Sequence, residues 1–60
     1  MNELLTTDEA AELLRSNTNT LAFWRNQKQG PAWAKLGRRI VYRRSDLEAF
    51  IAASFEKSLV

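Results

Sequence analysis

The chain has 60 residues, with nine Lys or Arg, seven Asp or Glu and a formal net charge of +2, and this length predicts one domain with a small hydrophobic core. Because it contains no Cys and no His, it lacks disulfides, thiolate nucleophiles, imidazole bases and the usual zinc ligands, so we expect no enzyme, no metal site and no cofactor. No apolar run is long enough to span a bilayer and no signal-peptide pattern opens the chain, so we expect a cytoplasmic protein without a membrane partner.

The first helix is predicted at about 7–15. Thr6 and Glu9 have the spacing of a capping box, in which the hydroxyl accepts a hydrogen bond from the Glu9 amide and the carboxylate accepts one from the Thr6 amide. The apolar side of this helix comprises Ala10, Leu13 and Leu14. A position near the positive end of the helix dipole accounts for three carboxylates without any acid-base role: Asp8, Glu9 and Glu12.

A second helix is predicted over 18–28, between a polar turn and a Gly-Pro pair. Residues 16–20 read Ser-Asn-Thr-Asn-Thr, a composition that favours caps and turns, and we expect Asn17 to cap the helix. Gly30-Pro31 should end it, because proline lacks an amide hydrogen. With Leu21 and Trp24 on the buried side, the helical period predicts an outer side made of Asn19, Ala22, Phe23 and Asn26, flanked by Thr18 and Arg25. An alternative for Phe23 is a position beneath the following hairpin.

Residues 33–42 change to a period near two, which predicts a β-hairpin with a tight turn at Gly37-Arg38. Four side chains are expected to point inward: Trp33, Leu36, Ile40 and Tyr42. Val41 is expected to point outward between basic residues. An aliphatic side chain there, where a charged one is usual on an exposed strand, indicates a protein contact.

A third helix is predicted from Asp46 to about Ser54. Ser45 and Glu48 repeat the capping-box spacing, and the residues expected to return to the core are Leu47, Phe50 and Ile51. We therefore expect a folded domain over 1–54 and a flexible tail over 55–60. Contact between neighbouring copies is expected through the hairpin region at Val41 or through three tail residues, Phe55, Leu59 and Val60.

The basic residues are concentrated in the middle of the chain. Eight of them lie in a stretch that contains no acid: Arg15, Arg25, Lys28, Lys35, Arg38, Arg39, Arg43 and Arg44. A continuous positive surface attracts polyanions, of which nucleic acid is the most abundant in a cell. Two helices joined by a tight turn, then a basic two-stranded ribbon and a closing helix, form a winged helix-turn-helix, a mostly helical fold with a small hairpin.

In that arrangement the second helix lies in the DNA major groove and the wing touches the backbone. Asn and Arg present paired hydrogen-bonding groups to adenine and guanine, so Asn19, Arg25 and Asn26 are candidates for base contacts and Phe23 for a thymine methyl. The full set expected on the recognition helix is Thr18, Asn19, Thr20, Ala22, Phe23, Arg25, Asn26 and Lys28. The set expected on the wing and the DNA backbone is Lys35, Gly37, Arg38, Arg39, Arg43 and Arg44.

Three segments resemble the excisionase and AlpA-type family of small phage and mobile-element DNA-binding proteins: residues 5–14, Thr20-Leu21 with Trp24-Arg25, and residues 35–50. The resemblance extends from residue 4 to about residue 52. It implies a MerR-like winged helix with its recognition helix at 18–28 and its wing at Gly37-Arg38-Arg39. Ser16 departs from the aliphatic turn residue usual in the family, and Ala22-Phe23 from a pair that usually contains Arg or Tyr.

Members of that family commonly act as recombination directionality factors. The resemblance implies cooperative binding to double-stranded phage attachment DNA, with self-association along the DNA, DNA bending, and a phage integrase that is directed toward excision in the cytoplasm of a bacterial host. The alternative within the family is a small AlpA-like transcriptional regulator.

Other functional classes make different predictions. A protein-interaction module, such as an antitoxin-like or adaptor domain, would bind DNA weakly even at low salt, whereas a DNA-binding protein loses affinity steeply as salt rises. An RNA-binding sheet would display aromatic side chains for base stacking, and here Trp33 and Tyr42 are expected in the core. An enzyme would need a nucleophile, a base or a metal cluster.

Overall fold

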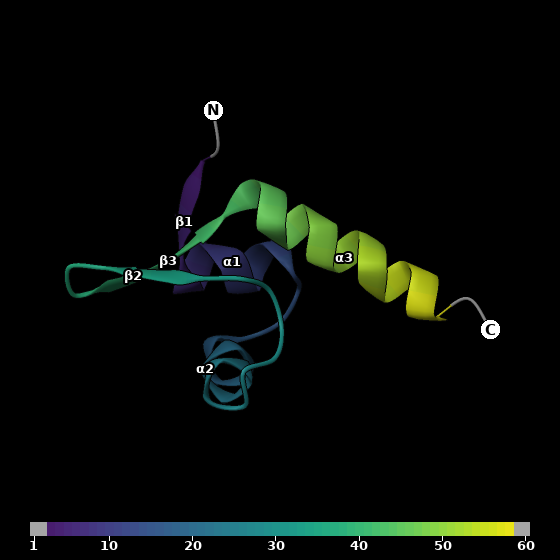
Figure 1. Ribbon diagram of the computed structural model, residues 1–60, viewed down its shortest axis with the longest axis horizontal. Helices are drawn as coiled ribbons and strands as arrows, with labels where there is room; N and C mark the ends of the chain where they lie inside the picture. The colour runs from purple at the N-terminus through teal and green to yellow at the C-terminus, as the bar shows by residue number, and fades with distance from the viewer. Residues whose placement is uncertain (1–2, 59–60) are drawn as a thin grey trace.

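The computed structural model describes residues 3–58 and has three helices and a three-stranded antiparallel sheet within them (Figure 1). The elements in chain order are β1 (Leu4–Thr6), α1 (Thr7–Leu13), α2 (Thr18–Asn26), β2 (Ala34–Leu36), β3 (Arg39–Arg43) and α3 (Arg44–Ser58). The predicted fold class is confirmed: the chain is mostly helical with a small hairpin, compatible with a winged helix-turn-helix. None of the helices within residues 3–58 has the length and apolar character needed to cross a membrane.

Helix α1 begins at the predicted capping box. Thr6 Oγ1 accepts a hydrogen bond from the Glu9 amide at 3.2 Å, and Glu9 Oε1 accepts one from the Thr6 amide at 2.9 Å. The helix ends two residues earlier than predicted, because Arg15 adopts a left-handed backbone conformation with φ of 56°. The Ser16 amide then donates to the Ala11 carbonyl at 2.8 Å, which closes the helix end.

Helix α2 is capped by Asn17, as predicted, with Asn17 Oδ1 accepting from the Thr20 amide at 2.8 Å. It ends at Asn26, two residues before the predicted end. Lys28 repeats the arrangement at Arg15: its φ is 55°, and the following Gln29 amide donates to the Trp24 carbonyl at 2.8 Å. This backbone reversal, rather than the later Gly30-Pro31, ends the helix.

Strand β1 was not predicted. It pairs antiparallel with β3, and Leu5 lies opposite Tyr42. Both side chains point to the helical side of the sheet, where they are buried. A strand of three residues that runs directly into a helix cap has no turn or alternation signal of its own, so only its distant partner strand identifies it.

The hairpin has the predicted turn, but its outer strand faces the other way. Leu36 pairs with Arg39, leaving a two-residue loop whose Gly37 has φ of 62°, the pattern of a type II′ turn. Leu36 therefore shares a face with Arg39 and Val41, opposite the face of Ile40 and Tyr42. Leu36 is 54% exposed and Trp33 is 42% exposed, so the inward prediction is wrong for both. For Leu36 the reason is the register with Arg39, because a shift of one residue reverses the face of a strand. Trp33 lies just before β2 and is not paired in the sheet.

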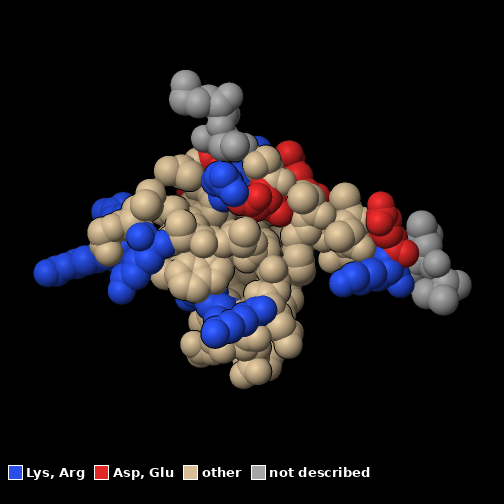
Figure 2. Space-filling model, in the orientation of Figure 1, with Lys and Arg blue, Asp and Glu red and all other residues tan. Residues whose placement is uncertain are grey.

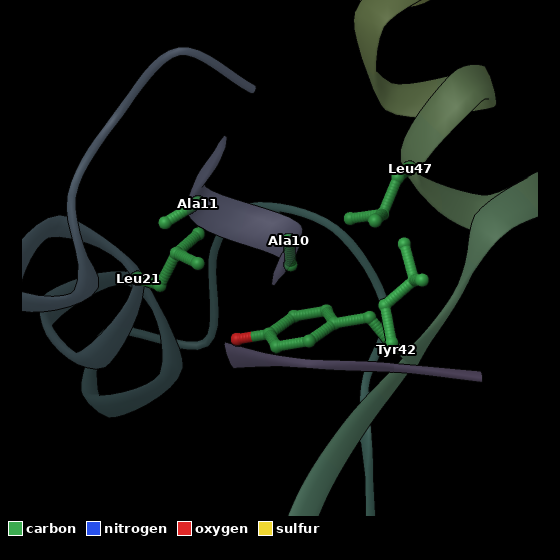
Figure 3. Packing of buried hydrophobic residues seen from close by; sticks show 6 residues of the cluster. Ala10, Ala11, Leu21, Tyr42 and Leu47 are labelled. Atoms are coloured by element: carbon green, nitrogen blue, oxygen red, sulfur yellow. The ribbon is translucent and has the colours of Figure 1, made fainter. Parts of the chain in front are cut away.

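Six side chains form the core of the described residues: Leu5, Ala10, Ala11, Leu21, Tyr42 and Leu47. The Tyr42 ring extends from β3 toward α2 beneath Ala10 (Figure 3). Helix α1 contacts α2, α3 and the strands β1 and β3, so it lies at the centre of the fold. Partly buried side chains extend the core: Leu13, Leu14, Trp24 and Ile40.

Helix α3 differs from its prediction at both ends. It follows β3 without a loop and starts at Arg44, so Ser45 lies inside the helix and not at a cap. It continues to Ser58, which makes residues 55–58 helical rather than a tail, whereas Leu59 and Val60 lie outside the described residues. Its first half packs on the domain through buried Leu47, while its second half extends away from the body (Figure 1).

Candidate nucleic-acid interface

The outer side of α2 is exposed, as the helical period predicts. Asn19 and Asn26 are exposed there, and Phe23 is 57% exposed, which excludes a position beneath the hairpin. Leu21 on the opposite side is buried, and Trp24 packs on the Phe50 ring of α3 with centroids 5.4 Å apart. The helix is thus anchored by its inner side and presents amide groups and one aromatic ring to solvent.

Arg25 is half-buried, like Thr20 and Ala22, and differs from the other predicted residues of this helix because its guanidinium contacts side chains of the protein. Its Nη1 donates a hydrogen bond to the Tyr42 hydroxyl at 2.7 Å. Its Cζ lies 5.9 Å from the centre of the Trp33 ring, within the range of a cation–π contact. Arg25 therefore connects α2 to β3 and to the start of the hairpin.

The hairpin carries three exposed positive charges close together in the sequence. Lys35, Arg38 and Arg39 are exposed, and none of them forms an ion pair within residues 3–58. Figure 2 shows Lys and Arg gathered at the hairpin end and over the α2 side, with Asp and Glu along the opposite edge and on α3. The separation of charge inferred from the sequence is therefore present in space at the hairpin.

Two arginines predicted to contact the DNA backbone each form an ion pair with a carboxylate. Arg43 Nε lies 2.7 Å from Asp46 Oδ2, and Arg44 Nε lies 2.7 Å from Glu3 Oε1. The hydrogen bond that Arg44 donates to Glu3, and then the negative charge of Glu3, raise the pKa of the Arg44 guanidinium above its ordinary value. The Arg44 side chain lines a wide acidic depression together with Glu3, Glu9, Glu12 and Arg15, away from the hairpin tip.

The family described as helix-turn-helix domain matches residues 4–54. The chain belongs to the helix-turn-helix domain family. Neither a search of curated proteins nor a search of solved structures gave a match. Membership indicates DNA binding by a domain of a generally non-enzymatic family.

The helix-turn-helix unit of this chain is α1, the residues 14–17 and α2. Ser16, the predicted departure from the related family, is half-buried in that turn, and its amide hydrogen bond to Ala11 holds the turn closed. This contact is made by the backbone and does not require an aliphatic side chain at Ser16.

The outer face of the sheet in this helix-turn-helix domain carries an apolar hollow of about 200 Å³. Its lining residues are Leu4, Ala32, Trp33, Ala34, Leu36, Val41, Arg43 and Asp46. Val41, at its floor on the central strand, was the sequence signal for this surface. Trp33 and Leu36 were missed because they were expected in the core.

Proposed function

We propose that this helix-turn-helix protein binds double-stranded DNA sequence-specifically and acts as an excisionase, a recombination directionality factor for a phage integrase in a bacterial host cell. The observation that carries the DNA-binding part is the exposed outer side of α2 next to a hairpin whose cations, Lys35, Arg38 and Arg39, are not paired with carboxylates of the described residues. In such a fold the second helix enters the major groove while the wing follows the backbone.

In the proposed complex the outer side of α2 reads bases. Asn19 and Asn26 each offer an amide donor and acceptor that match an adenine edge, and Phe23 offers an apolar edge to a thymine methyl. The flanking residues of the helix, Thr18, Thr20, Ala22 and Lys28, line the groove. The hairpin residues Lys35, Arg38 and Arg39, with Gly37 at the turn, neutralise phosphates and fix the register of the protein on the duplex.

Self-association along DNA is part of the proposal, and the apolar hollow on the sheet supports it. Leu4, Trp33 and Leu36 are each at least 42% exposed around it, and grouped apolar side chains on a surface are typical of protein contacts. Adjacent copies that touch on DNA bind cooperatively and together impose more bending than one copy. This is the behaviour expected of an architectural factor in recombination.

Footprinting on the DNA that flanks the gene for this protein tests the proposal. We expect protection of adjacent sites in the arm of an attachment site, with a steeper titration for two adjacent sites than for one. Protection confined to a promoter would instead favour an AlpA-like transcriptional regulator. Absence of protection at low salt would contradict DNA binding altogether, and a non-cooperative titration would contradict self-association.

The assignment of α2 as the base-reading element predicts the effect of Asn19→Ala. We expect a loss of about 1 to 3 kcal/mol in binding free energy, together with relaxed preference at one base pair, because one paired hydrogen-bond contact is removed. Competition binding with duplexes that differ at single positions measures both effects. Glu12→Ala, on the exposed surface of α1, is the control; unchanged discrimination by Asn19→Ala would show that α2 does not read the sequence.

A further inference from the structure

We propose that Arg25 contacts a DNA phosphate, not a base, and that Tyr42 and Trp33 hold its guanidinium in place for that contact. This inference rests on the proposed DNA binding and assigns Arg25 a role different from the one predicted from the sequence. It also gives the buried Tyr42 hydroxyl a function in recognition.

The position of Arg25 on α2 favours a phosphate. An α-helix turns by about 100° per residue, so Arg25 lies about 40° from the buried Leu21 and about 160° from the exposed Phe23 around the helix axis. Asn19 lies about 120° from Arg25 around the helix axis. When the outer side of a helix faces the floor of the major groove, a side chain on its inner flank faces the wall of the groove. That wall is formed by the sugar-phosphate backbone.

The contacts of Arg25 direct it toward the gap between helix and hairpin. Its Nη1 donates to the hydroxyl of Tyr42, a residue that is 1% exposed and fixed by the core. The Trp33 ring, just before β2, lies 5.9 Å from its Cζ. Both partners come from the hairpin side, so the guanidinium is held between the two elements expected to touch DNA.

Holding the side chain in this way favours binding. An arginine carries five N–H donors, and the Tyr42 bond uses one of them, which leaves four for an anion, including those on Nε and Nη2. Arginine that is already ordered loses less conformational entropy when it binds than a freely rotating side chain. Tyr42 and Trp33 are therefore positioning residues for a charge-assisted contact through Arg25.

The test combines protein variants with single neutral linkages in the DNA. The probe is a duplex selected by the wild-type protein from a random-sequence pool, remade with one methylphosphonate at each backbone position in turn. We expect Arg25→Gln to weaken binding about 10- to 100-fold on all duplexes alike, the range for a hydrogen bond to a charged group. At one linkage the neutral substitution should weaken wild-type binding but have little effect on Arg25→Gln.

Tyr42→Phe removes only the hydroxyl that holds Arg25, and it leaves the positive charge of Arg25 in place. We expect it to weaken binding about 3- to 10-fold, about half the free energy lost with Arg25→Gln, and to reduce the effect of the same neutral linkage. A variant that merely loosened the fold would lower affinity at every linkage without this coupling. Thermal unfolding establishes that Tyr42→Phe is folded. Arg15→Gln is the matched charge control, because it removes a guanidinium from the acidic depression, and it should couple to no single linkage.

The outcomes separate this inference from the function on which it rests. If the wild-type protein binds no duplex at low salt, the proposed DNA binding itself is wrong. If the wild-type protein binds and Arg25→Gln binds equally well, or relaxes preference at one base pair without coupling to a linkage, Arg25 is not a phosphate contact. If one neutral linkage weakens binding of the wild type but not of Arg25→Gln, while Tyr42→Phe binds every duplex like the wild type, the positioning role of Tyr42 is wrong.

Discussion

Replacement of Gly30 by alanine is expected to lower the free energy of unfolding by about 2 to 5 kcal/mol, the sum of overpacking and backbone strain. A Cβ at Gly30 would lie 2.8 Å from Cε3 and 3.0 Å from Cβ of Trp24, and the φ of Gly30 is +80°. Trp24 cannot move away freely, because it packs on the core and on Phe50 of α3. For a domain of this size the total stability is roughly 3 to 9 kcal/mol, so we expect a large unfolded fraction.

Gly37→Ala is the matched control for this change. Gly37 also has positive φ, +62°, but a Cβ at this position would have no atom within 4 Å. Only the backbone strain of a left-handed alanine remains, about 1 to 2 kcal/mol. Urea unfolding followed by tryptophan fluorescence measures both losses. If the two variants were destabilised equally, the contact between Gly30 and Trp24 would have no energetic weight.

The local parts of the fold were predictable because their signals lie within a few residues. The Thr6–Glu9 capping box, the Asn17 cap and the Gly37-Arg38 turn each depend on contacts between residues at most three apart, and all three are present. The ends of α1 and α2 were less predictable. Two positions after the last helical residue, each chain reversal places a basic residue in the left-handed conformation, Arg15 after α1 and Lys28 after α2, where glycine normally marks such an end.

The parts that failed depend on distant pairing. β1 is a strand only because Leu5 lies opposite Tyr42, and the face of Leu36 follows from its register with Arg39. Strand β3 lies between β1 and β2, so β2 is an edge strand, and Leu36 on its outer face is a surface residue. Trp33, just before β2, is exposed as well. Trp33, expected in the core, thus presents an aromatic ring to solvent, as an RNA-binding surface would. The central strand nevertheless presents only Arg39, Val41 and Arg43 on its outer face, none of them aromatic, whereas RNA-binding sheets stack bases on aromatic strand residues.

The candidate interface was predictable in composition but not in contacts. The helical period placed Asn19, Phe23 and Asn26 on the outer side of α2, and they are exposed. The hydrogen bond between Arg25 and Tyr42 joins residues 17 apart, and the pair between Arg44 and Glu3 joins residues 41 apart. Neither follows from a local pattern. These long-range contacts decide which cations of the basic stretch remain available to a ligand.

Removal of both hairpin arginines, Arg38→Ala with Arg39→Ala, is expected to weaken DNA binding to all sequences alike. Each phosphate contact releases counterions and contributes about 0.9 to the slope of log K against log salt concentration, so the slope should fall by about 1.8. At physiological salt we expect about a 100- to 10,000-fold loss of affinity, since two charge-assisted contacts are lost and each contributes about 10- to 100-fold. Preference among related duplexes should be unchanged, because these residues position the protein and do not read bases.

Binding isotherms at several salt concentrations measure this slope. The matched control is Arg15→Ala with Lys57→Ala, which removes the same net charge from the acidic depression and from the far end of α3. The variant Arg38→Lys with Arg39→Lys conserves both positive charges, so it should keep most of the slope of log K against log salt concentration. If the control lowered the slope as much as the hairpin variant, the affinity would come from the overall charge of the molecule. In that case the hairpin would not act as a wing, because a wing contributes through direct phosphate contacts that cations elsewhere on the surface cannot replace.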